Sequence, residues 1–226
     1  MNTSFFNHQT LSFLQQLSNN NNRPWFNERK SLYEQSVREP SLAFIEAMEP
    51  SIKSLSPNFT AVAKKTGGSL MRIYRDARFS SDKTPYKTNI GIQFRHTAGK
   101  DVHAPGFYLH ISPDTCFVGA GIWRPNSKAL SNIREMISDS PNAWKNITRH
   151  NTFKRYYTLS GDSLKTYPRG YAKDHPMIND LKRKDFIAIH PLTHEEILSP
   201  NLTKTIHHRF KVDLMDYLCN ALELPY

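Results

Sequence analysis

The hydrophobic pattern changes its period part-way along the chain, and this change constrains the fold more than any other feature of the sequence. Before residue 70, apolar residues recur every three or four positions, as on one face of a helix. Over residues 70–123 they alternate with polar residues or glycine. Alternation with a period of two gives each strand of a sheet one apolar face. The sequence therefore predicts helices followed by a sheet that buries one side.

Four strands are predicted between Leu70 and Trp123. Their apolar positions are Met71 and Ile73, then Ile90, Ile92 and Phe94, then Phe107, Leu109 and Ile111, and finally Cys116, Val118, Ala120 and Ile122. The short turn at residues 112–114 joins the third strand to the fourth, which predicts an antiparallel hairpin. A longer loop over residues 96–106 joins the second strand to the third.

Polar residues and glycines occupy the other face of these strands. By parity that face collects Arg72, Tyr74, Asp76, Gln93, Arg95, Tyr108 and His110. Because the apolar face is expected to pack against helices, this polar face is where we expect a functional site.

Helical patterns precede the sheet in residues 1–56. Pro24 suits the first turn of a second helix, which Pro40 is expected to end. Pro50 is expected to kink or split a third helix. We therefore expect a helical layer at the N-terminus.

The chain after the sheet, residues 126–226, is predicted to form helices with one or two added strands near residues 153–159 and 186–189. Leucines and other apolar residues then repeat every four positions over residues 202–222, which predicts one long amphipathic helix. A length of 226 residues suits one domain. The predicted fold class is α+β, a single domain with a mostly antiparallel sheet (70–123) packed against N- and C-terminal helices.

The stretch LMRIYRDARFSSDKTPYKTN, residues 70–89, holds more chemistry than any comparable window. It contains five cationic side chains and two carboxylates, interleaved with Tyr74, Phe79 and Tyr86. Arginine recognises phosphate or carboxylate in a planar, bidentate manner, and lysine adds a mobile charge. The mixture is more typical of a ligand site than of a solvated loop. The alternative for individual cations is that they pair with Asp76 and Asp82 and brace the loop.

This stretch, read as RIYRDARFSSDKTPYKTNIG, closely resembles the signature of the domain-of-unknown-function family 2461. The Asn-rich loop followed by RPWF and the segment LKTYPRGYAKDHPMINDLKRKDF are similar to that family as well, so the resemblance covers most of the chain. The family has no established activity. The resemblance therefore implies which residues belong together and leaves the function open.

We expect one anion-binding pocket on the polar sheet face. The candidate ligand-binding residues are Arg72, Tyr74, Arg75, Asp76, Arg78, Asp82, Lys83, Tyr86, Lys87, His110, Gly119, Gly121, Arg169 and Lys184. Gly119 and Gly121 would leave room for a ligand, or would serve a bulge or a close approach between strands. Arg169 and Lys184 would complete the pocket from the second family-like segment.

Motifs for known chemistries are absent from the sequence. It has no P-loop, no GxGxxG opening a helix, no GxSxG and no HExxH. His110 could act as a general acid or base, although histidines at such positions more commonly only form hydrogen bonds. No catalytic residue, metal site or cofactor is assigned. Asp76 and Asp82 would bind Mg²⁺ only if a phosphorylated substrate supplied further oxygens.

The formal net charge of +10 favours anionic partners. No apolar run is long enough to cross a membrane, and the N-terminus lacks the pattern of a signal peptide, which favours the cytoplasm. Cys116 and Cys219 are expected to be buried thiols. The favoured function is binding of a phosphate-bearing or other anionic small molecule, and whether the protein also acts on that molecule is left open by the sequence. The alternatives are a nucleic-acid-binding protein, which exposed aromatic residues on a basic surface would favour, and an interaction scaffold.

Overall fold

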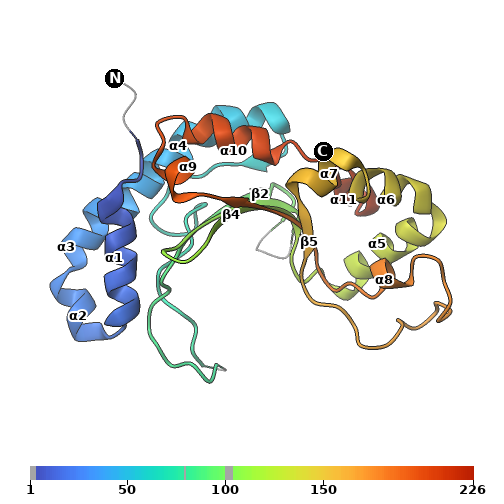
Figure 1. Ribbon diagram of the computed structural model, residues 1–226, viewed down its shortest axis with the longest axis horizontal. Helices are drawn as coiled ribbons and strands as arrows, with labels where there is room; N and C mark the ends of the chain where they lie inside the picture. Colours follow the sequence, from blue (N-terminus) through green and yellow to red (C-terminus); the bar gives the residue numbers. More distant parts are fainter. Residues whose placement is uncertain (1–3, 79, 100–103) are drawn as a thin grey trace.

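A six-stranded antiparallel sheet separates the two sides of the molecule (Figure 1). The computed structural model describes residues 4–78, 80–99 and 104–226. The strand order is β1-β2-β3-β4-β6-β5. The strands are β1 (Phe59–Thr60), β2 (Ile90–His96), β3 (Gly106–Ile111), β4 (Cys116–Ile122), β5 (Thr158–Ser160) and β6 (Phe186–Leu192). Three of the four strands predicted between residues 70 and 123 are confirmed, as is the β3–β4 hairpin.

The register places the predicted faces as the alternation requires. Ile92 lies opposite Leu109, which lies opposite Val118, and all three are buried. On the other face, Gln93 lies opposite Tyr108, which lies opposite Gly119. The sheet therefore has one apolar face and one face of mixed polar residues and glycines.

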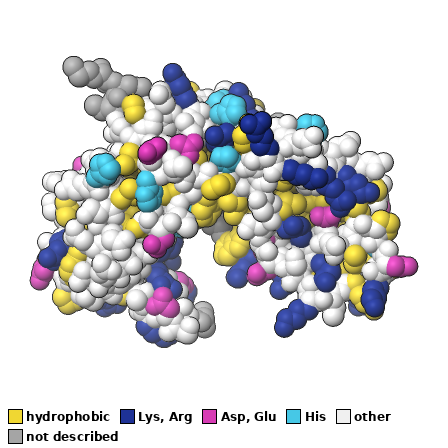
Figure 2. Space-filling model, viewed as in Figure 1, with side chains coloured by type: hydrophobic (Ala, Val, Ile, Leu, Met, Phe, Trp, Pro, Cys, Tyr) yellow, Lys and Arg dark blue, Asp and Glu magenta, His cyan; other side chains and the backbone are white. Residues whose placement is uncertain are grey.

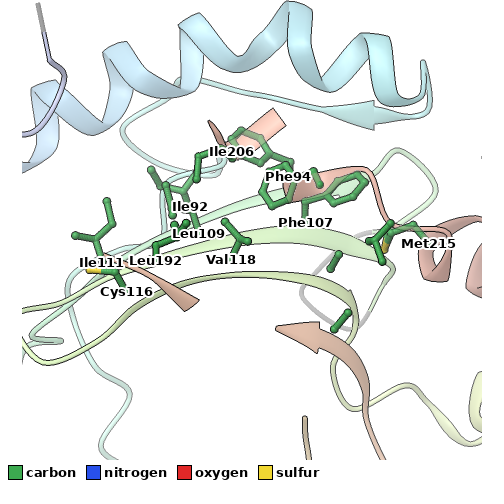
Figure 3. Packing of buried hydrophobic residues seen from close by; sticks show 14 of the residues in the cluster. Ile92, Phe94, Phe107, Leu109, Ile111, Cys116, Val118, Leu192, Ile206 and Met215 are labelled. Atoms are coloured by element: carbon green, nitrogen blue, oxygen red, sulfur yellow. The ribbon is translucent and has the colours of Figure 1, made fainter. Parts of the chain in front are cut away.

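Among the described residues, the helices that pack on the central strands lie on the apolar face. Above it in Figure 1 lie α4 (Glu39–Leu55) and α10 (Leu202–Phe210), and α11 (Leu214–Ala221) contacts the β4 strand nearby. Figure 3 shows Ile206 of α10 and Met215 of α11 in the same apolar layer as the strand residues. The Phe107 and Phe210 rings pack with their centroids 4.7 Å apart. Burial of these side chains is the main force holding helices to sheet, and the α+β fold class is confirmed.

The N-terminal layer consists of α1 (His8–Asn19), α2 (Arg23–Glu28), α3 (Lys30–Tyr33) and a π-helical turn, η1 (Glu34–Arg38). Asn22 caps α2 through its side chain, and a proline occupies the first turn, as predicted for Pro24. The predicted stop at Pro40 is wrong. The chain continues from η1 into α4 in helical geometry, and the carbonyl oxygen of Ser36, four residues before Pro40, accepts a hydrogen bond from the Thr10 hydroxyl at 2.8 Å in place of the missing N–H. Pro50 does not split α4 either.

The strand predicted at Leu70–Tyr74 is wrong. This segment forms only two isolated bridges, Leu70 with Ile92 and Tyr74 with Tyr86. Its first residues bond to β2, where the Met71 backbone N–H donates to the Gly91 carbonyl oxygen at 2.9 Å, whereas the rest bonds within its own loop, where Lys87 donates its backbone N–H to the Ile73 carbonyl oxygen at 2.7 Å. The two-residue strand β1 pairs with β2 farther along, opposite Arg95 and His96.

The C-terminal part adds α5 (Ser127–Asp139), α6 (Pro141–Thr148), α7 (Asn151–Tyr156), α8 (Ile178–Leu181) and α9 (His194–Leu198). The strand predicted at residues 186–189 is confirmed as part of β6, whereas most of residues 153–159 form the end of α7 and only β5 is extended. The single long helix predicted over 202–222 is wrong. The chain breaks between α10 and α11, so that Phe210 packs on the sheet while Tyr217 packs on Trp144 of α6. Among the described residues, no helix is long and apolar enough to cross a lipid bilayer.

Candidate ligand-binding cavity

The uncovered face of the sheet forms the roof of a cavity of about 500 Å³. Figure 2 shows this hollow under the sheet, with hydrophobic side chains deep in it and basic side chains along its sides. Strands β2, β3, β4 and β6 supply the roof, and Met71, Lys87 and Trp123 supply parts of the walls. The volume lies within the range of small-molecule sites in proteins.

Most of the cavity lining is apolar. Phe117 comes from β4, Ile187 and Ile189 come from β6, and Met71 comes from the 70–89 loop. The isoleucines reach the cavity because β6 pairs with β4 in a register that sets Ile189 opposite Gly119. A ligand that fills this space therefore buries an apolar surface.

Lys87 carries the only charge on the lining as described. It is half-buried, and burial lowers the pKa of its ammonium group below the ordinary value of 10.5, with a smaller contribution from the nearby positive charge of Arg72. Its side chain forms no hydrogen bond or ion pair with any residue for which the structure gives a position. The site thus presents a partly desolvated cation without a protein counter-ion in the described parts of the chain.

Tyr108 brings a hydroxyl group to the cavity, and His110 lies behind it. The Tyr108 hydroxyl oxygen is 3.3 Å from His110 Nδ1, and the His110 ring stacks on Phe117 with centroids 4.7 Å apart. Burial raises the pKa of Tyr108 to about 12, and burial also lowers the pKa of His110. Both side chains are therefore neutral near pH 7, and His110 positions Tyr108 without lining the cavity itself.

The two glycines of β4 have different roles. A Cβ atom added to Gly119 would meet Ile187 Cγ2 at an ordinary 3.4 Å, so the absence of a side chain here opens the cavity. Gly121 has a φ of +146°, and a Cβ there would lie 2.0 Å from the Phe186 carbonyl oxygen. Gly121 is therefore required by the close approach of β6, which is the alternative that the sequence left open.

Carboxylates brace the 70–89 loop from within. Arg78 binds Asp76 through two hydrogen bonds of 2.9 and 2.7 Å, and Arg75 pairs with Asp82. The hydrogen bond from the Arg78 side chain lowers the pKa of Asp76 to about 2. The pKa of Asp82 is also lowered to about 2, mainly by hydrogen bonds from the Thr84 backbone N–H and hydroxyl and to a smaller extent by Arg75. For Arg75 and Arg78, the bracing role is thus the one that the structure describes.

The predicted site residues are not brought into one pocket. Lys87, Gly119 and Gly121 line the cavity, whereas Tyr74, Arg75, Asp76, Arg78, Lys83 and Tyr86 line a second, open hollow against α2. Asp82 braces the loop, His110 lies behind Tyr108, and Arg72, Arg169 and Lys184 are exposed and line neither space. Met71 faces the cavity where parity expected Arg72, because Leu70 forms its bridge opposite Ile92 of the buried face, and the residues after Ile73 then fold back as a loop. Phe79 and residues 100–103 of the predicted long loop lie outside the described residues.

Tyr86 is held in the core and is anchored by a residue that the sequence analysis did not single out. Its ring is 3% exposed and stacks on Phe26 with centroids 4.2 Å apart. The Asn21 side chain donates to the Tyr86 carbonyl oxygen at 2.9 Å and accepts from the Tyr86 backbone N–H at 3.1 Å. This bidentate contact fixes the 70–89 loop to the corner between α1 and α2. The sequence does not single out Asn21, because nothing local marks which asparagine of the run reaches across 65 residues.

Replacing Asn21 by alanine is expected to lower the free energy of unfolding by about 1 to 3 kcal/mol, because two backbone groups of Tyr86 lose their partners. Urea denaturation measures the loss, and hydrogen exchange should show faster exchange in residues 70–89. Asn20→Ala is the matched control, since the Asn20 side chain bonds only to the exposed Gln16 carbonyl oxygen. Equal losses in the two variants would contradict the anchoring role.

The described residues, 4–78, 80–99 and 104–226, contain no group of three or more His, Cys, Asp or Glu side chains that could hold a metal ion. The two cysteines, Cys116 and Cys219, are free and buried, as expected.

Comparison with known families agrees with this pattern of residues. A family model described as "Conserved hypothetical protein (DUF2461)" matches residues 9–217 of the 226-residue chain. The chain belongs to the DUF2461 family. The resemblance based on residues 70–89 is therefore confirmed, and the DUF2461 match takes in both the cavity and the loops beside it. No match is found among curated proteins.

Proposed function

We propose that the protein binds a small organic anion in the sheet cavity, with the apolar body of the ligand under the strands and its anionic group at Lys87. The observation that carries this proposal is the position of Lys87 at an apolar cavity without a counter-ion among the described residues. A partly buried charge is costly unless it is paired, and a ligand carboxylate or phosphate would supply the missing partner.

The rest of the cavity supports the same ligand class. Gln93 and Tyr108 are the uncharged polar side chains of the lining and can orient a ligand through hydrogen bonds. A strongly polyanionic ligand would fit poorly, because a single cation lines the described cavity and Phe117, Ile187 and Ile189 surround it. The favoured ligand therefore carries one anionic group on an apolar or aromatic body.

A thermal-shift screen of aromatic carboxylates and nucleoside monophosphates, each beside its neutral ester or nucleoside, is expected to raise the melting temperature for the anions only. Lys87→Ala is expected to weaken binding of a hit by about 10- to 100-fold, the worth of a hydrogen bond to a charged group. Affinity should also fall as pH rises through the pKa of Lys87, because loss of its proton removes the charge that binds the anion. That fall should begin below pH 10.5, the ordinary pKa of lysine.

Two further variants make the result specific to the cavity. Gly119→Leu should fill the space while sparing the fold, since a Cβ at this position meets only ordinary contacts. Lys83→Ala is the control, because Lys83 is exposed and lines the other hollow. If binding survived both Lys87→Ala and Gly119→Leu, or if Lys83→Ala weakened it equally, the proposal would be wrong.

A further inference from the structure

Two basic segments flank the cavity and come from opposite ends of the sheet. The first, residues 70–89, leads into β2, and the second, residues 161–184, connects β5 to β6. Figure 1 shows both on the side of the sheet away from α4 and α10. The first segment contains five Lys or Arg against two Asp, and the second contains six against three. The sheet cavity therefore lies between two segments that each carry a net positive charge.

Exposed aromatic side chains mark the same region. Among the residues described, the large hydrophobic side chains that are exposed are Tyr74 at 50%, Trp123 at 44% and Tyr167 at 53%. Tyr74 belongs to the first basic segment, Tyr167 belongs to the second, and Trp123 lines the cavity between them. Basic surfaces interleaved with aromatic rings are typical of proteins that bind single-stranded nucleic acid, since each base can stack on a ring.

The cavity itself suits one unstacked base. Tyr108 and Phe117 supply aromatic rings from the roof, Trp123 supplies one from the wall, and the missing side chain of Gly119 leaves space beside them. Gln93 lines the cavity, and its side-chain amide makes no hydrogen bond within the part of the chain that the structure describes. An amide of this kind can both donate to and accept from the edge of a base.

We propose that the anion bound in the cavity is one nucleotide of a single-stranded nucleic acid, whose neighbouring phosphates contact the two basic segments. This inference rests on the proposed function, because the base occupies the apolar cavity and its phosphate meets Lys87. A duplex is the poorer partner, since its bases stay paired and stacked and cannot enter a cavity under a sheet.

Fluorescence anisotropy with labelled 12-nucleotide single strands of DNA and RNA, and with a 12-base-pair duplex, tests the inference. Single strands are expected to bind at least about tenfold more tightly than the duplex. Their log Kobs should fall with log salt by about 0.7 for each phosphate contacted. Trp123→Ala should weaken single-strand binding by about 5- to 100-fold, the range for loss of one stacked base.

A charge-reversal pair of variants separates the strand from the single nucleotide. The triple variant Lys165→Glu, Arg169→Glu and Lys173→Glu changes three exposed residues of the second segment. It should reduce both strand affinity and salt dependence while leaving mononucleotide binding in the thermal-shift assay unchanged. The matched control is Lys53→Glu, Lys204→Glu and Lys211→Glu, an equal charge change at exposed positions in or next to α4 and α10, on the other side of the sheet.

The outcomes distinguish this inference from the function on which it rests. If small anions bind through Lys87 but single strands bind no more tightly than mononucleotides, the inference is overturned and the proposed function stands. Equal losses in the two triple variants, or equal binding of a 12-residue polyglutamate, would show attraction by net charge alone and would also overturn it. If strand binding were insensitive to both Lys87→Ala and Gly119→Leu, no base would occupy the cavity, and the inference would be overturned. If neither small anions nor strands bind, both proposals fail.

Discussion

Gly121→Ala is expected to lower the free energy of unfolding by about 3 kcal/mol, a large loss for the addition of one methyl group. The added Cβ would lie 2.0 Å from the Phe186 carbonyl oxygen and 2.8 Å from Ile187 Cα, so the backbone of β6 must move away. The alanine would also have to adopt a φ of +146°, a backbone conformation that residues other than glycine disfavour. Urea denaturation followed by circular dichroism measures the loss.

The same substitution two residues earlier on the same strand is the control. Gly119→Ala places its Cβ 3.4 Å from a flexible atom, Ile187 Cγ2, and Gly119 has no positive φ. We expect a change of less than about 1 kcal/mol there. Similar losses at both positions would mean that β4 and β6 do not approach each other as described, and the cavity roof would then need revision.

The alternating pattern was sufficient to predict β2, β3 and β4 and their faces, because burial of one face leaves only one register that keeps the apolar residues inside. It failed at Leu70–Tyr74, which alternates equally well. Alternation specifies the direction of side chains, but whether a segment joins a sheet depends on backbone partners. Here Met71 bonds to the Gly91 carbonyl of β2, but the later partners lie within the loop, where the Pro85 carbonyl accepts from Arg75 and the Ile73 carbonyl accepts from Lys87.

The helical spacing failed in a similar way at the C-terminus. Apolar residues repeat every four positions across the break between α10 and α11, so the pattern carries no mark of it. The break becomes clear only from packing: Phe210 contacts the sheet and Tyr217 contacts Trp144 on a different helix. A single straight helix cannot serve both contacts.

The composition of the 70–89 stretch could locate the region of the candidate site, but it could not show which charged side chains pair with each other and which face the cavity. Arg75, Arg78 and Lys87 look alike in sequence, yet the first two have carboxylate partners a few residues away and the third faces an apolar cavity. That cavity depends on Ile187 and Ile189, which reach it through the pairing of β6 with β4 across about 70 residues of chain. Long-range pairing of this kind has no local signal.

Asp185 is the second position at which a large effect is expected, and it too was not apparent from the sequence. The residue is 2% exposed, and its two carboxylate oxygens accept backbone hydrogen bonds from Arg124 at 2.7 Å and from Asp162 at 2.8 Å. It thus ties the end of β4, beside Trp123, to the turn that follows β5. Arg124 has a φ of +48°, uncommon for a residue other than glycine, and its bond to Asp185 helps to hold that conformation.

Asp185→Ala is therefore expected to lower the free energy of unfolding by about 3 to 5 kcal/mol, because two backbone N–H groups in partly buried hydrogen bonds lose a charged acceptor together. Asp185→Asn should lose less, since its remaining carbonyl oxygen can still accept one of the two bonds while its NH₂ group faces the other donor. Asp174→Ala, an equal charge change at an exposed residue of the neighbouring basic segment 161–184, should change stability by less than about 0.5 kcal/mol. Urea denaturation of the three variants ranks them. If Asp185→Ala proved no more harmful than Asp174→Ala, the carboxylate would not hold the two turns together, and the placement of Trp123 at the cavity would lose its support.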